Sequence, residues 1–278
     1  MRPSNDISRL RNLHTLTRRY CMNRTEHWRQ VYSAMPERPL FGDYSAEQYR
    51  TFPRYNVLDA ILEGVEALVP EDFKEVESLR AKLIEAGATD NLMTRPPHNV
   101  IEQEAIDDER ATFVRYVESI RESDLRDVEP LFYRRTLRSE EISSFWSRLD
   151  ERWTKPGLFY PLNEKPEGVD VEAFHVSIFA NEVGYRWLSD RLLQRGLTRV
   201  FELDEGGASG REIDLAFAEQ PEYGASGGLE IWWTDENVSF VIYASHESSI
   251  MFGGWLLDDL RLAWPSWESR TYTGWDQA

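Results

Sequence analysis

The spacing of apolar residues predicts helices through most of the first half of the chain. Apolar side chains recur every three to four residues, which is the pattern of a helix that buries one face. The segments with this pattern are residues 7–35, 57–68, 73–84 and 101–119. Ser45 with Gln48 three residues later forms a capping-box pattern, which predicts a short helix that ends at Pro53. We expect residues 1–128 to form a helical domain.

The pattern changes to that of β-strands in the second half. β-branched and aromatic residues bounded by turn formers predict strands at residues 131–137, 198–203, 229–233, 238–244 and 249–252. Helical spacing returns at residues 139–149, 181–194 and 255–262. We therefore expect an α+β protein, in which a domain of residues 129–278 holds an antiparallel sheet flanked by helices that cover one face.

The composition is that of a folded globular protein. Of the 278 residues, 41% are hydrophobic and 13% aromatic, which can supply a sizeable core. The apolar runs fall far short of the roughly 18–20 residues that cross a bilayer, so we expect neither a transmembrane helix nor a membrane partner. Cys21 is the only cysteine, which excludes an internal disulfide and a cysteine metal cluster. We expect a cytoplasmic protein.

Charge is distributed unevenly along the chain. The net charge is −17, yet residues 1–38 hold eight arginines against three acids, whereas 21 acids face 8 bases from Tyr160 onward. Such a field repels nucleic acid from the C-terminal half and favours a basic protein partner. Contact with nucleic acid is expected only through the basic N-terminal helix. Acidity that serves solubility alone is the competing explanation.

Four carboxylates alternate along two neighbouring candidate strands. Glu202 and Asp204 precede a glycine-rich connection, and Glu212 and Asp214 follow it. If the two pairs faced each other, they could bind Mg²⁺ or Mn²⁺ and support a metal-dependent hydrolase or nuclease. A hairpin whose polar positions face water explains the same alternation without a metal or any other cofactor.

A histidine and a glutamate, His246 and Glu247, follow the apolar strand at residues 238–244. A histidine beside a carboxylate could act as a general base. Adjacent strand residues point to opposite faces, however, and no nucleophile-elbow motif accompanies the pair. A polar turn between two strands is the alternative interpretation.

Tryptophans are concentrated in the acidic half, which holds seven of the ten from Trp187 onward. Trp232 and Trp233 are adjacent on a predicted strand, so we expect one of the two rings to face away from the core. With Asp235 and Glu236 in the following turn, an exposed ring would form a binding surface for a basic partner.

The sequence favours a non-enzymatic binding protein over the metal-dependent hydrolase. Its acidic α+β profile without a catalytic motif resembles bacterial immunity proteins that neutralise basic toxins, and this likeness is one of composition. It implies an inhibitor of a basic protein partner that works without a cofactor.

Overall fold

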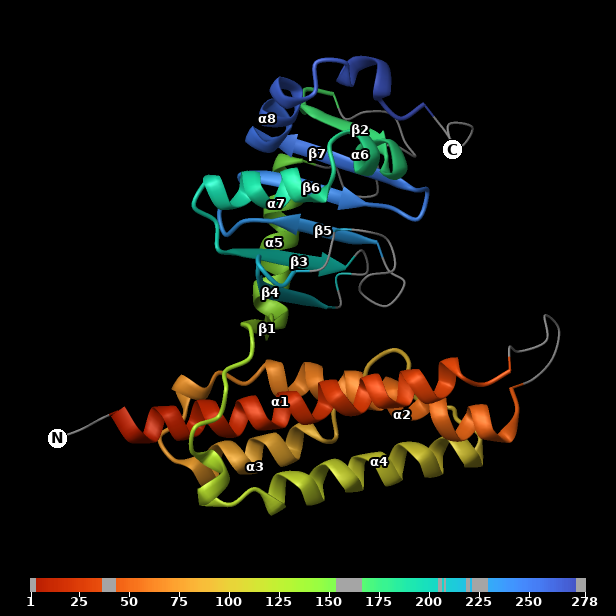
Figure 1. Ribbon diagram of the computed structural model, residues 1–278, viewed down its shortest axis with the longest axis vertical. Coiled ribbons are helices and arrows are strands. Elements are labelled where there is room, and N and C mark those ends of the chain that lie inside the picture. The colour runs from red at the N-terminus through yellow and green to blue at the C-terminus, as the bar shows by residue number, and fades with distance from the viewer. Residues whose placement is uncertain are drawn as a thin grey trace. The chain divides into compact units, whose positions relative to one another are not determined.

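The computed structural model divides into two compact units, Met1–Leu131 and Phe132–Ala278 (Figure 1). It describes residues 4–36, 44–153, 167–204, 207, 209–218, 221 and 230–273. Within these residues, the first unit is helical and the second contains a seven-stranded antiparallel sheet with helices. The predicted α+β class, with a helical N-terminal half and a C-terminal sheet flanked by helices, is confirmed.

In the described part of the first unit, four helices pack around one apolar core. The core takes residues from every helix, including Leu13, Ile61, Leu79 and Phe113, and each of these side chains is fully buried. The periodic apolar residues give each helix one apolar face, and these faces pack against one another in the core. The helices are α1 (Ser4–Ser33), α2 (Ala46–Glu66), α3 (Val76–Ala86) and α4 (Val100–Ser119), with 3₁₀ turns at Pro70–Asp72 and Glu122–Leu125.

The helix that begins after Ser45 does not end at Pro53, as the sequence predicted. Ser45 and Gln48 form the expected capping box, but α2 continues through Pro53 to Glu66. An internal proline costs a helix about 3 kcal/mol. The part of α2 beyond it buries several apolar side chains, each worth roughly 1.5–3 kcal/mol, and Val57 and Ile61 are among them. The burial of these side chains thus outweighs the tendency of Pro53 to end the helix.

Charged side chains are also buried inside the helical unit. Glu109 on α4 is fully buried and accepts hydrogen bonds from Arg24, Arg54 and the indole N–H of Trp28. The bond from Arg24 is bidentate, which is the strong geometry for a guanidinium and a carboxylate. These contacts tie α1, α2 and α4 together through one carboxylate.

The second unit is built on a sheet in the order β1-β4-β3-β5-β6-β7-β2, with every pair antiparallel. The edge strand β2 was not predicted. The strands of the sheet are β1 (Arg134–Thr136), β2 (Val171–His175), β3 (Arg199–Asp204), β4 (Gly210–Asp214), β5 (Ile231–Thr234), β6 (Phe240–Ala244) and β7 (Ser249–Gly254). The helices of the second unit are α5 (Ser139–Arg152), α6 (Val176–Glu182), α7 (Tyr185–Gln194) and α8 (Trp255–Ala263), followed by a 3₁₀ turn at Trp267–Arg270.

Helices cover both faces of this sheet, whereas the sequence predicted helices on one face. Figure 1 shows α5 behind the sheet and α6 and α7 in front of it. Two separate apolar clusters result. Phe145 and Leu149 of α5 belong to one cluster, and Leu188 of α7 and Leu257 of α8 belong to the other. The central strands are consequently buried on both sides, so β5 and β6 read as continuous apolar runs.

No helix among the described residues combines the length and the apolar character needed to cross a membrane.

Candidate functional site

Both tryptophans of the predicted binding surface are buried. Trp232 is 2% exposed and Trp233 is 3% exposed. Trp232 packs in the cluster under α5, and Trp233 packs in the cluster under α6, α7 and α8. The two rings do point to opposite faces of β5, as the alternation of a strand requires. The expectation that one of them faces solvent is wrong, because a helix layer covers each face.

The two acids that follow these tryptophans have different roles. Asp235 is buried and accepts hydrogen bonds from the backbone N–H and the hydroxyl of Ser239, so it closes the turn between β5 and β6. Glu236 is exposed at that turn. Only Glu236 is therefore placed where a partner could touch it.

The four predicted metal-binding carboxylates do not converge on one point. The antiparallel register pairs Glu202 with Arg211 and Phe201 with Glu212. Because directly opposed residues share a face, Glu202 and Asp204 lie on one face of the sheet, and Glu212 and Asp214 lie on the other. The prediction of a single carboxylate cluster is corrected by this register.

Each of these carboxylates has protein donors instead. Glu202 accepts a hydrogen bond from the indole of Trp233, and Asp204 accepts two from Ser209. Burial alone would raise the pKa of Glu212, but hydrogen bonds from Arg199, Tyr133 and Arg135 outweigh it and hold the pKa below its usual value. Asp214 accepts a hydrogen bond from the backbone N–H of Tyr133.

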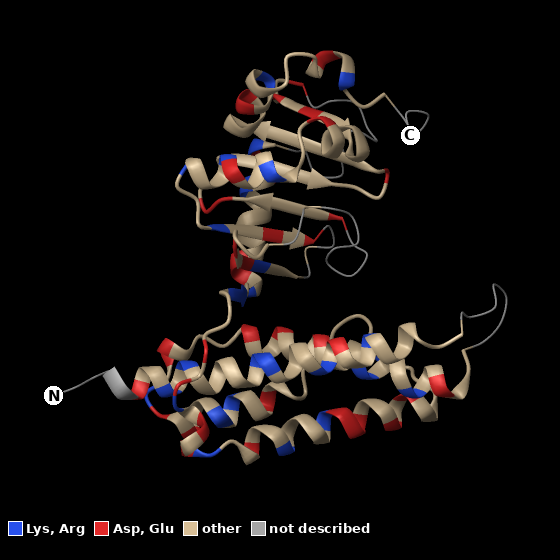
Figure 2. Cartoon of the chain, in the orientation of Figure 1, with Lys and Arg blue, Asp and Glu red and all other residues tan. Residues whose placement is uncertain are grey.

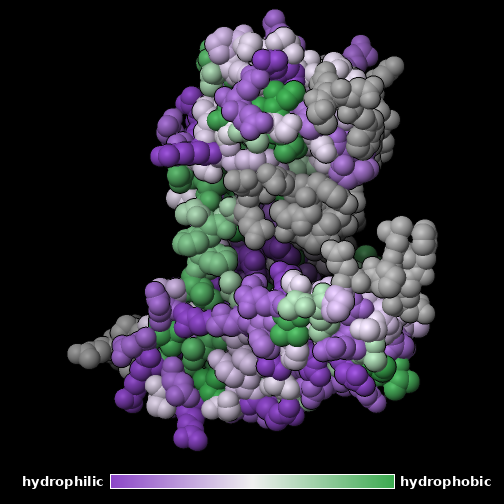
Figure 3. All heavy atoms as spheres, turned by 45° about the vertical axis from the view of Figure 1, so that its right-hand side comes forward, coloured by the Kyte–Doolittle hydropathy of each residue, from purple (hydrophilic) through white to green (hydrophobic). Residues whose placement is uncertain are grey.

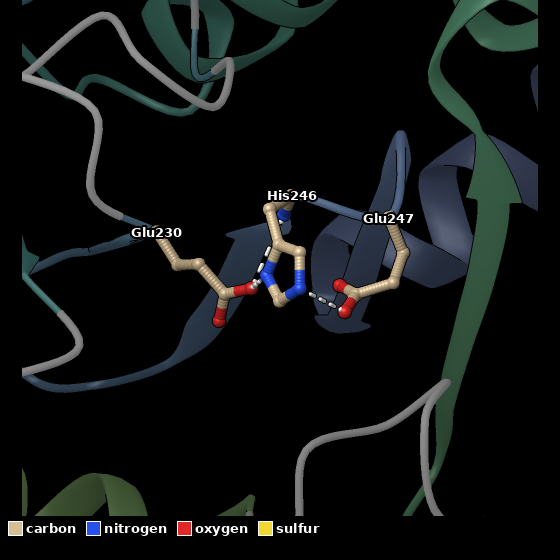
Figure 4. A group of neighbouring side chains, drawn as sticks. All are labelled: Glu230, His246 and Glu247. Carbon is tan, nitrogen blue, oxygen red and sulfur yellow. Dashed lines mark hydrogen bonds and ion pairs between the residues drawn. The ribbon is translucent and has the colours of Figure 1, made fainter. Parts of the chain in front are cut away.

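The structure does assemble a carboxylate–imidazole–carboxylate group around the second predicted pair. His246 and Glu247 form the turn between β6 and β7, and Glu230 lies immediately before β5 (Figure 4). The Nδ1 atom of His246 pairs with Glu230, and its Nε2 atom lies 2.6 Å from Oε1 of Glu247. One ligand atom from each residue lies within 4.8 Å of the others, and these three residues could together hold a metal ion.

The two carboxylates are buried, whereas the imidazole is accessible. The side chains of Glu230 and Glu247 are 4% and 2% exposed, whereas that of His246 is 52% exposed. The hydroxyl of Tyr243 donates a hydrogen bond to Glu230, and the backbone N–H of His246 donates another to the same carboxylate over 3.1 Å. The pairing of β5 with β6 thus positions Glu230 beside the turn.

One oxygen of Glu247 has no donor. Its Oε2 atom is buried and has no hydrogen-bond partner within the described part of the chain. A buried acceptor left without a partner costs roughly 1–3 kcal/mol, and more when it is charged. The sequence did not indicate Glu230, because it is 16 residues from His246 and only the β5–β6 hairpin brings them together.

A second feature that the sequence did not indicate lies in the helical unit. Eight residues between Pro96 and Asp107 line an open hollow of about 460 Å³, between the loop that precedes α4 and the first turns of that helix. One of them, Val100, is a large apolar residue that is 73% exposed. Leu92 and Met93, earlier in the same loop, are 77% and 62% exposed. The apolar residues of this loop are visible in the sequence, but the sequence did not indicate that their side chains are exposed.

Comparison with known proteins finds no matching family model, no similar curated protein and no similar solved structure.

Proposed function

We propose that the chain is a binding protein for a basic protein partner, and that it receives this partner on the helical unit. The binding surface consists of Leu92, Met93, Pro96, Pro97, Val100, Glu104 and Asp107, and is called the 92–107 surface. The observation that carries the proposal is the exposure of three large apolar side chains within nine residues of one loop and the start of α4, where Val100 lines the hollow. The chain then acts by binding rather than catalysis, and its partner contacts the 92–107 surface instead of the tryptophans, which are buried.

The apolar part of this surface supports a protein partner. Exposed apolar residues that occur singly need no explanation, but a contiguous group rimmed by polar residues is typical of an interaction site. Of the six large apolar side chains that are strongly exposed among the described residues, three belong to the 92–107 surface. Figure 3 shows hydrophobic side chains that reach the surface of the helical unit among hydrophilic ones.

The charge beside this surface supports a basic partner. The first turns of α4, from Val100 to Asp107, carry the acids Glu102, Glu104 and Asp107 and neither lysine nor arginine, while Arg95 is the one such base in the preceding loop (Figure 2). Glu104 and Asp107 line the hollow itself, and both are exposed. With a net charge of −17 for the whole chain, long-range attraction would accelerate association with a cationic protein.

An immunity or inhibitor role is the finer form of this proposal. A bacterial immunity protein that neutralises a basic toxin would need an acidic surface with an apolar anchor site, as the 92–107 surface has. A cytoplasmic location belongs to the same proposal, since Cys21 is a free and buried thiol. Genes next to that of this protein would test the role, because an adjacent gene for a basic secreted toxin is expected.

The direct test begins with capture of a partner from the native host by the full chain. We expect a basic protein whose association rate falls as salt rises, because the Debye length shrinks from ~30 Å at 0.01 M to ~8 Å at 0.15 M. In surface plasmon resonance, the double substitution Leu92→Ser with Met93→Ser is expected to raise the dissociation rate at least about tenfold, as for an interface anchor.

The matched control is Leu262→Ser, which removes an equally exposed leucine from the other unit. It is expected to leave both rate constants unchanged. An acidic partner, an association rate that is indifferent to salt, or equal effects of the two sets of substitutions would contradict the proposal.

A further inference from the structure

The Glu230–His246–Glu247 group places two carboxylates around one imidazole. Nδ1 of His246 pairs with Glu230, and Nε2 lies 2.6 Å from Oε1 of Glu247. Both glutamate side chains are almost completely buried. Each of the three residues offers an atom of a type that binds metal ions.

The unsatisfied atom is directed into the group. Figure 4 shows both oxygens of Glu247 turned toward the imidazole ring. Oε1 takes the contact with Nε2, and Oε2 is left without a partner in the described residues. Since Oε2 is buried, a lysine or arginine of a partner protein could not reach it without displacing the turn. A single small cation could.

We propose that Glu230, His246 and Glu247 bind one divalent transition-metal ion of the zinc or manganese class. Two carboxylates and a neutral imidazole balance the charge of a dication. Imidazole favours Zn²⁺ and its neighbours, and carboxylates also suit Mn²⁺. The site lies in the second unit and does not depend on the 92–107 surface.

The surroundings of the three residues fit this assignment. Zinc ligands lie about 2.0–2.2 Å from the ion, so ligand atoms around one ion are roughly 3–4 Å apart. A spread of up to 4.8 Å therefore needs only a small closure. The exposed His246 ring can turn to supply it, giving one nitrogen to the metal. The hydroxyl of Tyr243 and the backbone N–H of His246 hold Glu230 in place, as residues behind metal ligands commonly do.

The test is calorimetric titration of the full chain, after treatment with a chelator, with ZnCl₂ and separately with MnCl₂. We expect binding of one ion per chain for at least one metal. His246→Ala is the decisive variant, because its half-exposed side chain can be removed without opening the core. Loss of a ligand is expected to weaken binding at least about tenfold. Glu247→Gln should weaken it similarly, with circular dichroism to verify that the variant is folded.

Two control variants separate this site from surface binding. His27→Ala removes an exposed histidine in the helical unit, and Glu236→Gln removes an exposed acid at the β5–β6 turn, at the opposite end of β6 from the site. Both are expected to bind the metal as the unaltered chain does. Absence of binding for both metals, unchanged affinity in folded His246→Ala, or a loss in His27→Ala or Glu236→Gln equal to that in His246→Ala would overturn the proposal.

Discussion

At the scale of single residues, the helical unit shows how burial changes the chemistry of an ionisable group. His14 on α1 is 8% exposed, and its Nε2 atom donates a hydrogen bond to the carbonyl oxygen of Val65 over 2.9 Å. Burial disfavours the charged imidazolium and lowers the pKa of His14 to about 4. The histidine therefore stays neutral in the folded protein at pH values where it would be protonated in the unfolded chain.

This shift predicts a loss of stability in mild acid. The unfolded chain binds a proton near pH 6.5, whereas the folded chain does so only near pH 4, so stability falls as the pH drops through this window. Between pH 7.5 and pH 5 the contribution is about 2 kcal/mol. Urea unfolding of the native chain and of His14→Gln, followed by circular dichroism, should show a shallower pH dependence for the variant. Identical pH dependence in both would contradict the assignment.

At the scale of elements, the joint between β7 and α8 depends on one glycine. Gly254 has φ 71° and ψ −155°, a backbone conformation that is essentially confined to glycine. A Cβ atom at this position would lie 2.4 Å from the carbonyl oxygen of Ser239. Gly196 follows α7 with a φ of 82°, but a Cβ atom there would meet nothing within 4 Å.

Substitution by alanine is therefore expected to lower the free energy of unfolding by different amounts at the two glycines. Gly196→Ala introduces only left-handed backbone strain, which costs roughly 1–2 kcal/mol. Gly254→Ala adds a steric collision with the backbone of the adjacent β6 segment, so we expect at least about 3 kcal/mol. Urea unfolding followed by tryptophan fluorescence measures both. Equal destabilisation would show that the contact with Ser239 relaxes without cost.

At the scale of the whole molecule, each unit has a hydrophobic core of its own. The core of the helical unit is drawn from residues before Phe132, and the two clusters beside the sheet are drawn from residues after it. Nine of the ten tryptophans lie in the second unit, and Trp28 is the exception. Tryptophan fluorescence therefore reports mainly on the sheet unit, whereas helical circular dichroism has a large contribution from the first unit.

Two cores predict two unfolding transitions, detected at different urea concentrations by the two methods. Glu109→Gln leaves Arg24 and Arg54 without their buried carboxylate and is expected to destabilise the helical unit by about 3 kcal/mol. It should move the circular dichroism transition and leave the main fluorescence transition in place. Asp108→Asn, beside it on the exposed side of α4, is the control and should cost less than about 1 kcal/mol. One coincident transition that shifts for both methods would refute independent cores.

The sequence by itself determined the class of each half. Helices such as α4 depend on contacts between residues three and four apart, and the capping box at Ser45 lies within one turn, so both are visible as local patterns. The alternation of residues along β3 and β4 was equally local. His246 and Glu247 could be recognised as candidates because they are adjacent.

Only the tertiary structure decided what those residues face. The register of β3 against β4 placed Glu202 and Glu212 on opposite faces, and the second helix layer buried the ring expected in solvent. The pairing of β5 with β6 brought Glu230 to His246 across 16 residues. Strand order and register depend on which surfaces bury together across the whole chain, and residues that are distant in sequence share no local periodicity from which such contacts could be predicted.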